Sequence, residues 1–314
     1  MTPGILILTG QTASGKSALA LELAERFGAE IVGADSRQIY RGMPIGTAAP
    51  GADDLARAQH HLVGFLDPRE RYSAARFVAD AMAAIDAIHA RGKRAIVVGG
   101  TGFYVRALTG DVELSPAYDV ALRNRLAHEA RLHPPEVLRD WLAALAPQRA
   151  AAIAANDPYR VTRALEIALA ERTGARRDDA AGADRDDAGF ETAENLRTRG
   201  IAFRKLYLEI APDELERRIA ARVDAMLANG LLEEAERVGA EAVAADAVGY
   251  REALAYLAGW STRAELRAHL IRNTRRYAKR QATWFRTEPG LVRVPAAGVL
   301  AAAAAEAGAL PGWT

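Results

Sequence analysis

The stretch Gly10-Gln11-Thr12-Ala13-Ser14-Gly15-Lys16-Ser17 decides the fold of this chain of 314 residues. It has the spacing G-x-x-x-x-G-K-S of a phosphate-binding loop. The apolar run Ile5–Leu8 before it is typical of a buried parallel strand, and apolar residues at helical spacing follow it. In this strand–loop–helix context, backbone N–H groups and the helix dipole would hold a phosphate. We expect Lys16 to reach the outer phosphate oxygens and the Ser17 hydroxyl to bind Mg²⁺.

Strand and helix signals alternate through the first part of the chain. Glu30–Ala34 and Arg94–Val98 are apolar runs typical of buried strands, and Phe77–His89 between them has apolar residues at helical spacing. This order predicts an α/β fold, in which a parallel sheet containing the phosphate loop is flanked by helices. Because ligands bind at the carboxyl ends of such strands, we expect Asp35 and Thr101, which follow two of them, to lie near the loop.

The character of the sequence changes after residue 115. From Ser115 to about Arg172 strand signals disappear and helical spacing dominates, which predicts a helical insertion domain. Residues 175–195 have almost no large apolar side chains and predict a flexible loop. Strand character returns at Lys205–Ile210, and a helix is expected from Pro212 to Gly230. The predicted domains are a catalytic core of residues 1–115 and 200–314 and a helical insertion of residues 116–199.

Composition excludes several kinds of site. The net charge is only +1, so any affinity for nucleic acid must come from a local patch. The absence of cysteine excludes disulfides, thiolate nucleophiles and zinc held by cysteine. The adjacent pair His60-His61 is expected to be structural or to lie on the surface. Since the sequence has no secretory signal and no run long enough to span a bilayer, we expect a soluble, cytoplasmic monomer with no membrane partner.

Two polar clusters follow predicted strands. Asp35 suits a metal ligand, a general base or a turn cap, and its position alone does not separate these roles. Gln38 adds an amide capable of reading a base edge. Gly99–Tyr104 is a second glycine-rich turn, where Thr101 would offer its hydroxyl to a phosphate, to Asp35 or to the helix N-terminus.

Arginines gather in two places near the end of the chain. Arg218 and Arg222 lie one turn apart on the helix after Pro212, where they suit either a diphosphate clamp or surface ion pairs. Further on, basic residues with interleaved aromatic residues share one helix face, which favours contact with a nucleic-acid backbone over a solvated face of mixed charge. The residues of this basic face are Arg272, Arg275, Arg276, Lys279 and Arg280.

In combination, these motifs resemble those of the tRNA dimethylallyltransferases, also called tRNA isopentenyltransferases. After the phosphate loop, the segment Asp35–Tyr40 with Ile45–Thr47 is the most distinctive match, and the matches run in family order to about residue 286. The chain departs from the family at Ala49, where lysine is usual, so one basic contact is lost or replaced. The remaining matches are Gly99–Tyr104, Asn156–Arg160 with Arg163–Glu166, Arg222–Leu227, Gly249–Glu252 and Thr274–Gln281.

The resemblance implies transfer of the dimethylallyl group from dimethylallyl diphosphate to N6 of the adenosine just 3′ of the tRNA anticodon, with diphosphate released. It implies Mg²⁺ as the cofactor and does not imply ATP. Asp35 matches the family's proposed general base, and Thr101 and Arg222 are the other implied catalytic residues. The implied diphosphate-binding residues are Gly10, Thr12, Ala13, Ser14, Gly15, Lys16 and Ser17, with Ser17 as the metal ligand.

The resemblance also implies that the tRNA anticodon stem-loop is the partner and that the insertion helps to hold it. The acidic segment 175–195 is expected to point away from the RNA. The implied tRNA-binding residues are Asp35, Ser36, Arg37, Gln38, Thr101, Arg123, Tyr159, Arg160, Val161, Thr162, Arg163, Gly249, Tyr250, Arg251, Arg275, Arg276, Lys279 and Arg280.

Three other functions fit parts of the sequence. A P-loop kinase acting on a small molecule would turn over ATP and would not need the basic face. A prenyltransferase acting on free adenine nucleotides would need neither that face nor the insertion. A noncatalytic RNA-binding protein would leave Asp35 and Thr101, beside an intact phosphate loop, without a purpose.

Overall fold

The computed structural model describes residues 2–114, 120–154, 157–173 and 194–313. The chain divides into two compact units, one formed by Met1–Glu113 and Ala193–Thr314 and the other by Leu114–Thr192. Most of the segment 175–195, for which a flexible loop was predicted, lies outside the described residues. Among the described residues, no helix is both long and apolar enough to cross a membrane.

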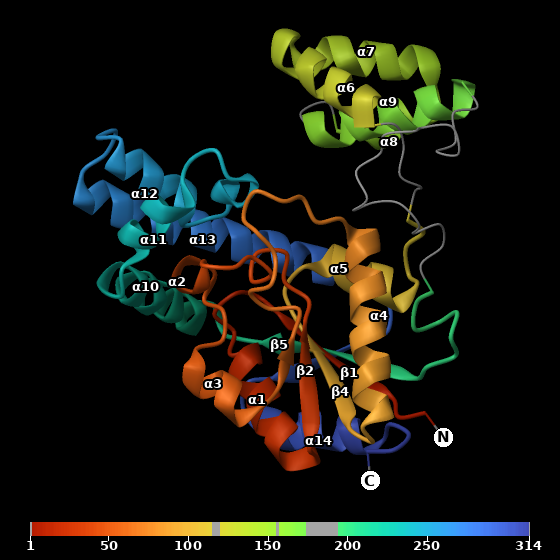
Figure 1. Ribbon diagram of the computed structural model, residues 1–314, viewed down its shortest axis with the longest axis vertical. Helices are drawn as coiled ribbons and strands as arrows, with labels where there is room; N and C mark the ends of the chain where they lie inside the picture. The colour runs from red at the N-terminus through yellow and green to blue at the C-terminus, as the bar shows by residue number, and fades with distance from the viewer. Residues whose placement is uncertain (1, 115–119, 155–156, 174–193, 314) are drawn as a thin grey trace. The chain divides into compact units, whose positions relative to one another are not determined.

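The first unit is built on a six-stranded, entirely parallel sheet with the order β3-β2-β4-β1-β5-β6 (Figure 1). This confirms the predicted α/β fold, and four of the six strands lie where the sequence predicted them. The strands are β1 (Ile5–Gly10), β2 (Ala29–Gly33), β3 (His60–His61), β4 (Arg94–Val98), β5 (Phe203–Glu209) and β6 (Leu291–Pro295).

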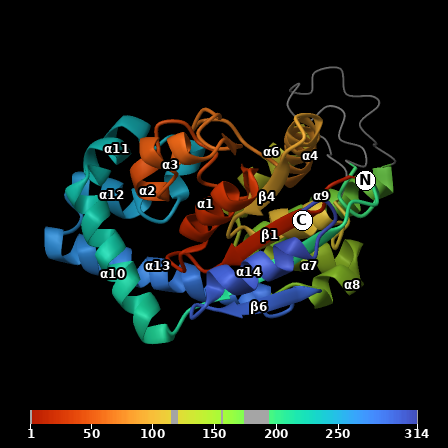
Figure 2. The same cartoon turned by 90° about the horizontal axis from the view of Figure 1, so that it is seen from below.

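Helices cover both faces of this sheet. Along β1 successive side chains point to opposite faces, so Leu6 and Leu8 pack toward α1 (Lys16–Phe27) and α14 (Val299–Gly308), which lie side by side in Figure 2. The opposite face is covered by helices that include α4 (Ala74–Ala90). Burial on both faces explains why β1 is apolar throughout and does not alternate.

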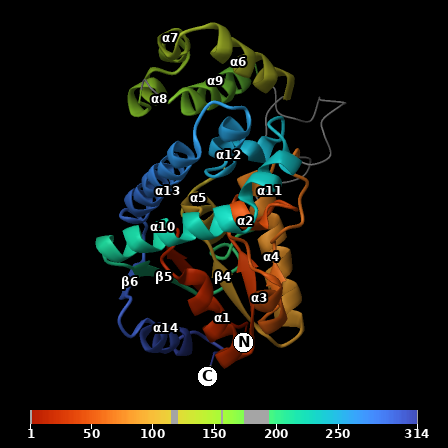
Figure 3. The same ribbon diagram turned by 90° about the vertical axis from the view of Figure 1, so that its left-hand side faces the viewer.

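A second group of helices packs beside the phosphate-loop edge of the sheet (Figures 1 and 3). Its longest member is α13 (Arg263–Phe285), which begins with a capping box. In this box the Thr262 hydroxyl accepts from the Glu265 N–H, and the Glu265 carboxylate accepts from the Thr262 N–H. The remaining helices of the first unit are α2 (Pro44–Thr47), α3 (Ala52–Arg57), α5 (Gly102–Thr109), α10 (Pro212–Ala228), α11 (Leu231–Val238), η2 (Val243–Asp246), α12 (Tyr250–Leu257) and α13 (Arg263–Phe285).

The described elements of the second unit are all helices with a small apolar core of their own, which includes Leu138, Leu142 and Leu165. The buried Glu166 carboxylate is paired with Arg123 and Arg163. The predicted insertion, 116–199, reaches further than this unit, because residues 194–199 belong to the first one. The helices are α6 (Val120–Leu132), α7 (Pro135–Leu145), α8 (Pro147–Ala152) and α9 (Pro158–Thr173).

The carboxyl end of the chain is part of the core, although its sequence gave no clear signal. Ala303 and Ala307 of α14 are buried against the sheet, and Trp313 is only 2% exposed. The indole of Trp313 meets the ring of Phe27 edge to face at 5.4 Å, and its Nε1–H donates to the carbonyl of Gly4. The two ends of the first unit are therefore joined by one aromatic side chain.

Replacing this side chain tests its contribution. Trp313→Ala is expected to lower the free energy of unfolding by about 3–5 kcal/mol, because it opens a large cavity and leaves the Gly4 carbonyl without its donor. Trp260→Ala is the matched control, since Trp260 is 83% exposed, and its effect is expected to be about 0.5 kcal/mol or less. Denaturant unfolding of both variants measures the difference, and equal losses would contradict this role of Trp313.

Candidate active site

The phosphate loop joins the buried end of β1 to the first turn of α1. Ala13 and Gly15 both have a left-handed backbone, with φ of 64° and 98°, and the Ser14 N–H donates to the Gln11 carbonyl. Gly15 relieves the strain that a side chain would cause at its position, whereas Ala13 adopts this conformation with a Cβ. The tight turn brings Lys16 and Ser17 to the wall of a pocket.

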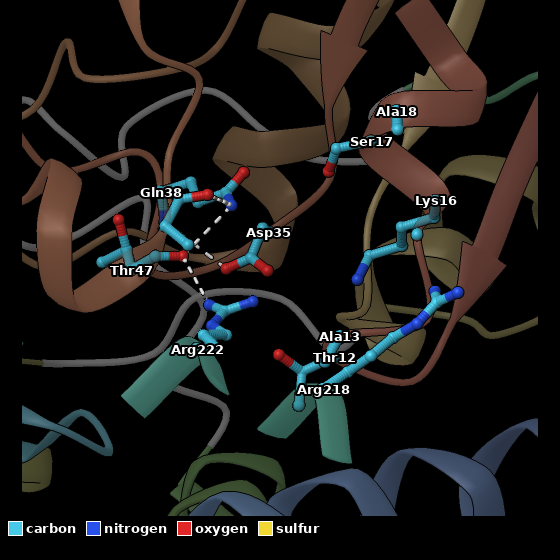
Figure 4. A pocket seen from close by; sticks show the side chains of 12 residues that line it. Thr12, Ala13, Lys16, Ser17, Ala18, Asp35, Gln38, Thr47, Arg218 and Arg222 are labelled. Carbon is cyan, nitrogen blue, oxygen red and sulfur yellow. Dashed lines mark hydrogen bonds between the residues drawn. The ribbon is translucent and has the colours of Figure 1, made fainter. Parts of the chain in front are cut away.

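This pocket has a volume of about 330 Å³ and lies at the carboxyl edge of β1 and β2, beside α10 (Figure 4). Such an edge is where parallel α/β sheets hold their ligands. The lining residues are Thr12, Ala13, Gly15, Lys16, Ser17, Ala18, Asp35, Gln38, Thr47, Ala48, Arg218 and Arg222.

Cationic groups outnumber anionic ones in the pocket wall. Desolvation lowers the pKa of Lys16 to about 8, with Asp35 opposing and Arg222 adding to this shift. Desolvation also lowers the pKa of Arg222, against the pull of Asp35. The Arg222 Nε–H is buried and has no hydrogen-bond partner within the part of the chain that the structure describes. A buried cation with a free donor suits an anionic ligand. Arg218 donates to the Ser14 carbonyl and is a third cationic side chain in the wall, with its charge shared in an ion pair with Glu214.

Asp35 both caps a turn and lines the pocket. Its Oδ1 accepts from the N–H groups of Arg37 and Gln38, at 2.9 and 3.4 Å. Among the described residues, no hydrogen bond is formed by Oδ2. The turn thus fixes one carboxylate oxygen and leaves the other available to accept a proton or a hydrogen bond from a ligand.

Thr101 acts on the neighbouring turn. Its Oγ1 accepts from the Ser36 N–H at 3.0 Å and donates to the Ser36 hydroxyl at 3.3 Å. The alternative in which this hydroxyl pairs directly with Asp35 is therefore not what the structure has. Thr101 instead ties the turn after β4 to the turn after β2.

The amide of Gln38 is already engaged. Its Nε2 donates to the carbonyls of Thr47 and Ala48, and the Thr47 carbonyl also accepts from Arg222. Gln38 and Arg222 are thereby joined through the last turn of α2, as Figure 4 shows for Thr47. Both bonds of Gln38 use Nε2. The predicted contact of Gln38 with a base edge would therefore be made by Oε1, unless these bonds break.

A buried carboxylate holds α2 in place. Glu234 is fully buried on α11 and accepts from the N–H groups of Ile45 and Gly46 and from the Tyr250 hydroxyl. A Cβ on Gly46 would lie 2.5 Å from the Tyr250 ring, so only glycine fits there. No sequence signal pointed to Glu234, because two of its three partners are backbone N–H groups some 190 positions away in the chain.

Two predicted tRNA contacts lie in the core instead of on the surface. Tyr250 and Val161 are buried, at 0% and 1% exposed. Tyr250 packs against Gly46 and bonds to Glu234, while Val161 belongs to the core of the second unit. Both side chains are therefore part of the packing of these helices.

The remaining predicted tRNA contacts of the first unit are at the surface or paired. Arg272, Arg275, Arg276, Lys279 and Arg280 are all exposed on α13. Arg275 pairs with Glu216, and Arg280 stacks over the ring of Tyr277. Arg37 is paired with Asp246. Gly249, with φ of 110°, is the N-cap of α12, and Arg251 in the first turn of that helix is exposed.

In the second unit, Tyr159 is 79% exposed at the start of α9. Arg160 next to it pairs with Asp157, and Thr162 bonds back to the Pro158 carbonyl. Arg123 and Arg163 neutralise Glu166. Asn156 of the quoted motif lies outside the described residues.

The fold and the pocket together define the class of this protein. A parallel sheet carries, at its carboxyl edge, three cationic side chains around one carboxylate, which is the arrangement of an α/β protein with a site for an anionic ligand.

Comparison with known proteins gives the family. The IPP transferase family matches residues 38–288, and the isopentenyl transferase family matches residues 3–72. A tRNA dimethylallyltransferase of Geobacter sulfurreducens is 41% identical over 292 residues, covering 91% of this chain and 90% of that protein. The chain therefore belongs to the IPP transferase family, whose curated members with this similarity are tRNA dimethylallyltransferases.

Solved structures agree with this assignment. The tRNA isopentenylpyrophosphate transferase of Bacillus halodurans is 34% identical, with a TM-score of 0.64 over 93% of this chain and 89% of that one. A eukaryotic dimethylallyltransferase acting on tRNA is 27% identical, with a TM-score of 0.73 over 96% of this chain and 76% of that one.

The pKa of Lys16 makes ligand binding sensitive to pH. Lys16 is charged below a pH of about 8 and neutral above it, so affinity for inorganic diphosphate is expected to fall as the pH rises through this value. In Lys16→Arg the guanidinium stays charged, and this loss is expected to disappear. Calorimetry on both proteins gives the ratio of their Kd values at each pH. The change in protonation of diphosphate affects both Kd values equally and cancels in this ratio. A ratio that is constant with pH would contradict the role of Lys16.

Proposed function

We propose that this protein transfers the dimethylallyl group from dimethylallyl diphosphate to N6 of the adenosine 3′ to the anticodon of tRNA, releasing diphosphate. The observation that carries the proposal is the cationic pocket built around Asp35 in a chain of this family. The pocket offers what the reaction needs, namely positive groups for a leaving anion and a carboxylate for a proton.

The leaving group is stabilised by charge. Breaking the allylic C–O bond places negative charge on the diphosphate, and Lys16, Arg222 and Arg218 face the space where that charge would develop. Fixed cations in a partly desolvated site stabilise such a charge more than water does, and they need little reorganisation as it forms. The free Nε–H of Arg222 supplies a donor that no described protein group uses.

The acceptor is activated by a base. The exocyclic amine of adenine is a weak nucleophile, and the Asp35 Oδ2 would accept its proton as the new C–N bond forms. The adenine must leave the base stack to reach this oxygen. Ser36 and Gln38, which follow Asp35 in the same turn and are held by Thr101 and by α2, would orient the flipped base.

The residues present fit Mg²⁺ as a companion of the diphosphate. Among the described residues, no group of three or more His, Cys, Asp or Glu side chains forms a metal site. Mg²⁺ is commonly held by one or two protein oxygens together with phosphates and water, and Ser17 in the pocket wall supplies such an oxygen. When bound, the ion would neutralise charge on the diphosphate.

The acceptor RNA is recognised by charge on α13. The exposed face formed by Arg272, Arg275, Arg276, Lys279 and Arg280 suits the phosphates of an anticodon stem-loop. In the second unit, Tyr159 is exposed enough to stack on a base. A mononucleotide acceptor would need neither feature.

A transfer assay tests the proposal. The protein with Mg²⁺ and labelled dimethylallyl diphosphate is expected to label an anticodon stem-loop with adenosine 3′ of the anticodon, but not a loop with that base replaced. In Asp35→Ala and Asp35→Asn the rate is expected to fall by roughly 10²–10⁴-fold, because the base is lost. Asp35→Asn keeps the shape of the side chain and an oxygen that can cap the turn. It therefore distinguishes loss of the negative charge from loss of the turn.

The rival functions give different outcomes. Labelling of free AMP at the rate of the stem-loop would assign the protein to the nucleotide prenyltransferases. ATP consumption with phosphorylation of a small molecule, and no prenyl transfer, would make it a kinase. RNA binding without turnover of either donor would leave a noncatalytic RNA-binding protein.

The role of α13 predicts a change in salt dependence. Removing a side chain that contacts phosphate, as in Arg276→Ala or Lys279→Ala, is expected to lower the slope of log K against log salt by about 0.7 to 0.9 for stem-loop binding. Arg267→Ala is the matched control on the same helix, since Arg267 is bound to both oxygens of Asp224. Filter binding at several salt concentrations measures the slopes, and equal slopes in all three variants would contradict this interface.

A further inference from the structure

One amide side chain of α13 is bonded to both glycine-rich turns of the site. Gln281 is buried, and its Oε1 accepts from the Thr12 N–H of the phosphate loop at 2.7 Å. Its Nε2 donates to the Gly100 carbonyl at 3.0 Å. Close by, the Gln11 side chain donates to the Ala278 carbonyl of the same helix at 3.1 Å. Three hydrogen bonds therefore fasten α13 to the two loops.

The glycines of the second turn make room for this helix. A Cβ on Gly100 would lie 2.1 Å from Gln281 Nε2, and a Cβ on Gly102 would lie 2.1 Å from Trp284 Cδ1. Neither glycine has a positive φ, so the backbone conformation does not require them. The close approach of α13 gives a reason for both glycines that does not involve the ligand.

The bonded amide determines which loop donors remain for a ligand. The Thr12 N–H points to Gln281, so it is not among the amides free to bind phosphate, while Thr12 and Lys16 still line the pocket. Gln281 thus fixes the start of the loop from outside the pocket. The residue before it, Arg280, belongs to the exposed basic face, so one rigid helix carries both features.

We propose that Gln281 is a positioning residue, which sets the shape of the phosphate loop and of the Gly99–Gly102 turn from the helix that faces the acceptor RNA. The proposal rests on the proposed function, since it assumes a diphosphate ligand in the pocket. Gln281 contacts no substrate in this arrangement. Its effect reaches the ligand through the Thr12 amide and the Gly100 carbonyl, which would otherwise be free to turn toward the pocket.

The test compares two variants of similar size on one helix. Gln281→Met keeps the length of the side chain and removes both hydrogen bonds, and its Kd for inorganic diphosphate is expected to rise about tenfold or more. Asn273→Leu breaks a bond from α13 to Glu252, away from the loops, and is expected to leave this Kd within about twofold. Calorimetry gives the Kd, and thermal unfolding gives the stability of each variant. In the transfer assay, the KM for dimethylallyl diphosphate is expected to rise more than kcat falls.

A second variant changes the other partner of the bond between Gln281 and the Gly100 carbonyl. Gly100→Ala introduces the Cβ that would displace the Gln281 amide, and it is expected to weaken diphosphate binding without any change on α13. Combined with Gln281→Met, it is expected to add little, because both changes break the same bond. If Gln281→Met does not fold, Gly100→Ala carries the test alone.

The outcomes separate this inference from the proposed function. In one outcome, Gln281→Met binds diphosphate as the wild type does and loses only as much stability as Asn273→Leu. This result would overturn the positioning role and leave Gln281 a packing residue. A wild-type protein that binds diphosphate in a Gln281-dependent way, but transfers no dimethylallyl group, would overturn the proposed function and support the positioning role.

Discussion

The site depends on holding positive charge close to a single carboxylate. Lys16 and Arg222 are desolvated by the protein around them, and burial of two cations side by side is unfavourable without an anion. Asp35 supplies part of the compensation, yet the Arg222 Nε–H keeps no partner among the described groups. The pocket therefore favours an anionic ligand, and it lies at the carboxyl edge of the sheet, where β4 stands between β1 and β2.

The turns around the pocket are held by hydrogen bonds from side chains that lie far away in the sequence. Glu234 fixes α2, which holds Gln38 and Arg222 through the Thr47 carbonyl. On the other side Thr101 fastens the turn that follows Asp35, and Gln281 fastens the phosphate loop. The turn after Asp35, the Arg222 side chain and the phosphate loop are thus each held by a hydrogen bond to another element, which is how a rigid electrostatic site is maintained.

The sequence predicted the central strands and the phosphate loop because their signals are local. β1, β2 and β4 are largely apolar runs that lead into glycine or aspartate, and β5 has Leu206–Leu208 shortly before the helix start at Pro212. By contrast, β3 has only two residues and β6 is a partly exposed edge strand. The core position of α14 was missed because an alanine-rich segment has no apolar periodicity. Asp35, Lys16 and Arg222 were predicted from spacing and resemblance, and all three line the pocket. Glu234 and the contacts of Gln281 depend on distant backbone partners, which no local pattern reveals.

Inhibition by the product tests whether the cationic pocket holds a diphosphate leaving group. Inorganic diphosphate is expected to inhibit transfer competitively against dimethylallyl diphosphate, and this inhibition is expected to weaken strongly in Arg222→Gln. Diphosphate that inhibits equally at all donor concentrations, or ATP that displaces the donor and loses its terminal phosphate, would contradict this role of the pocket.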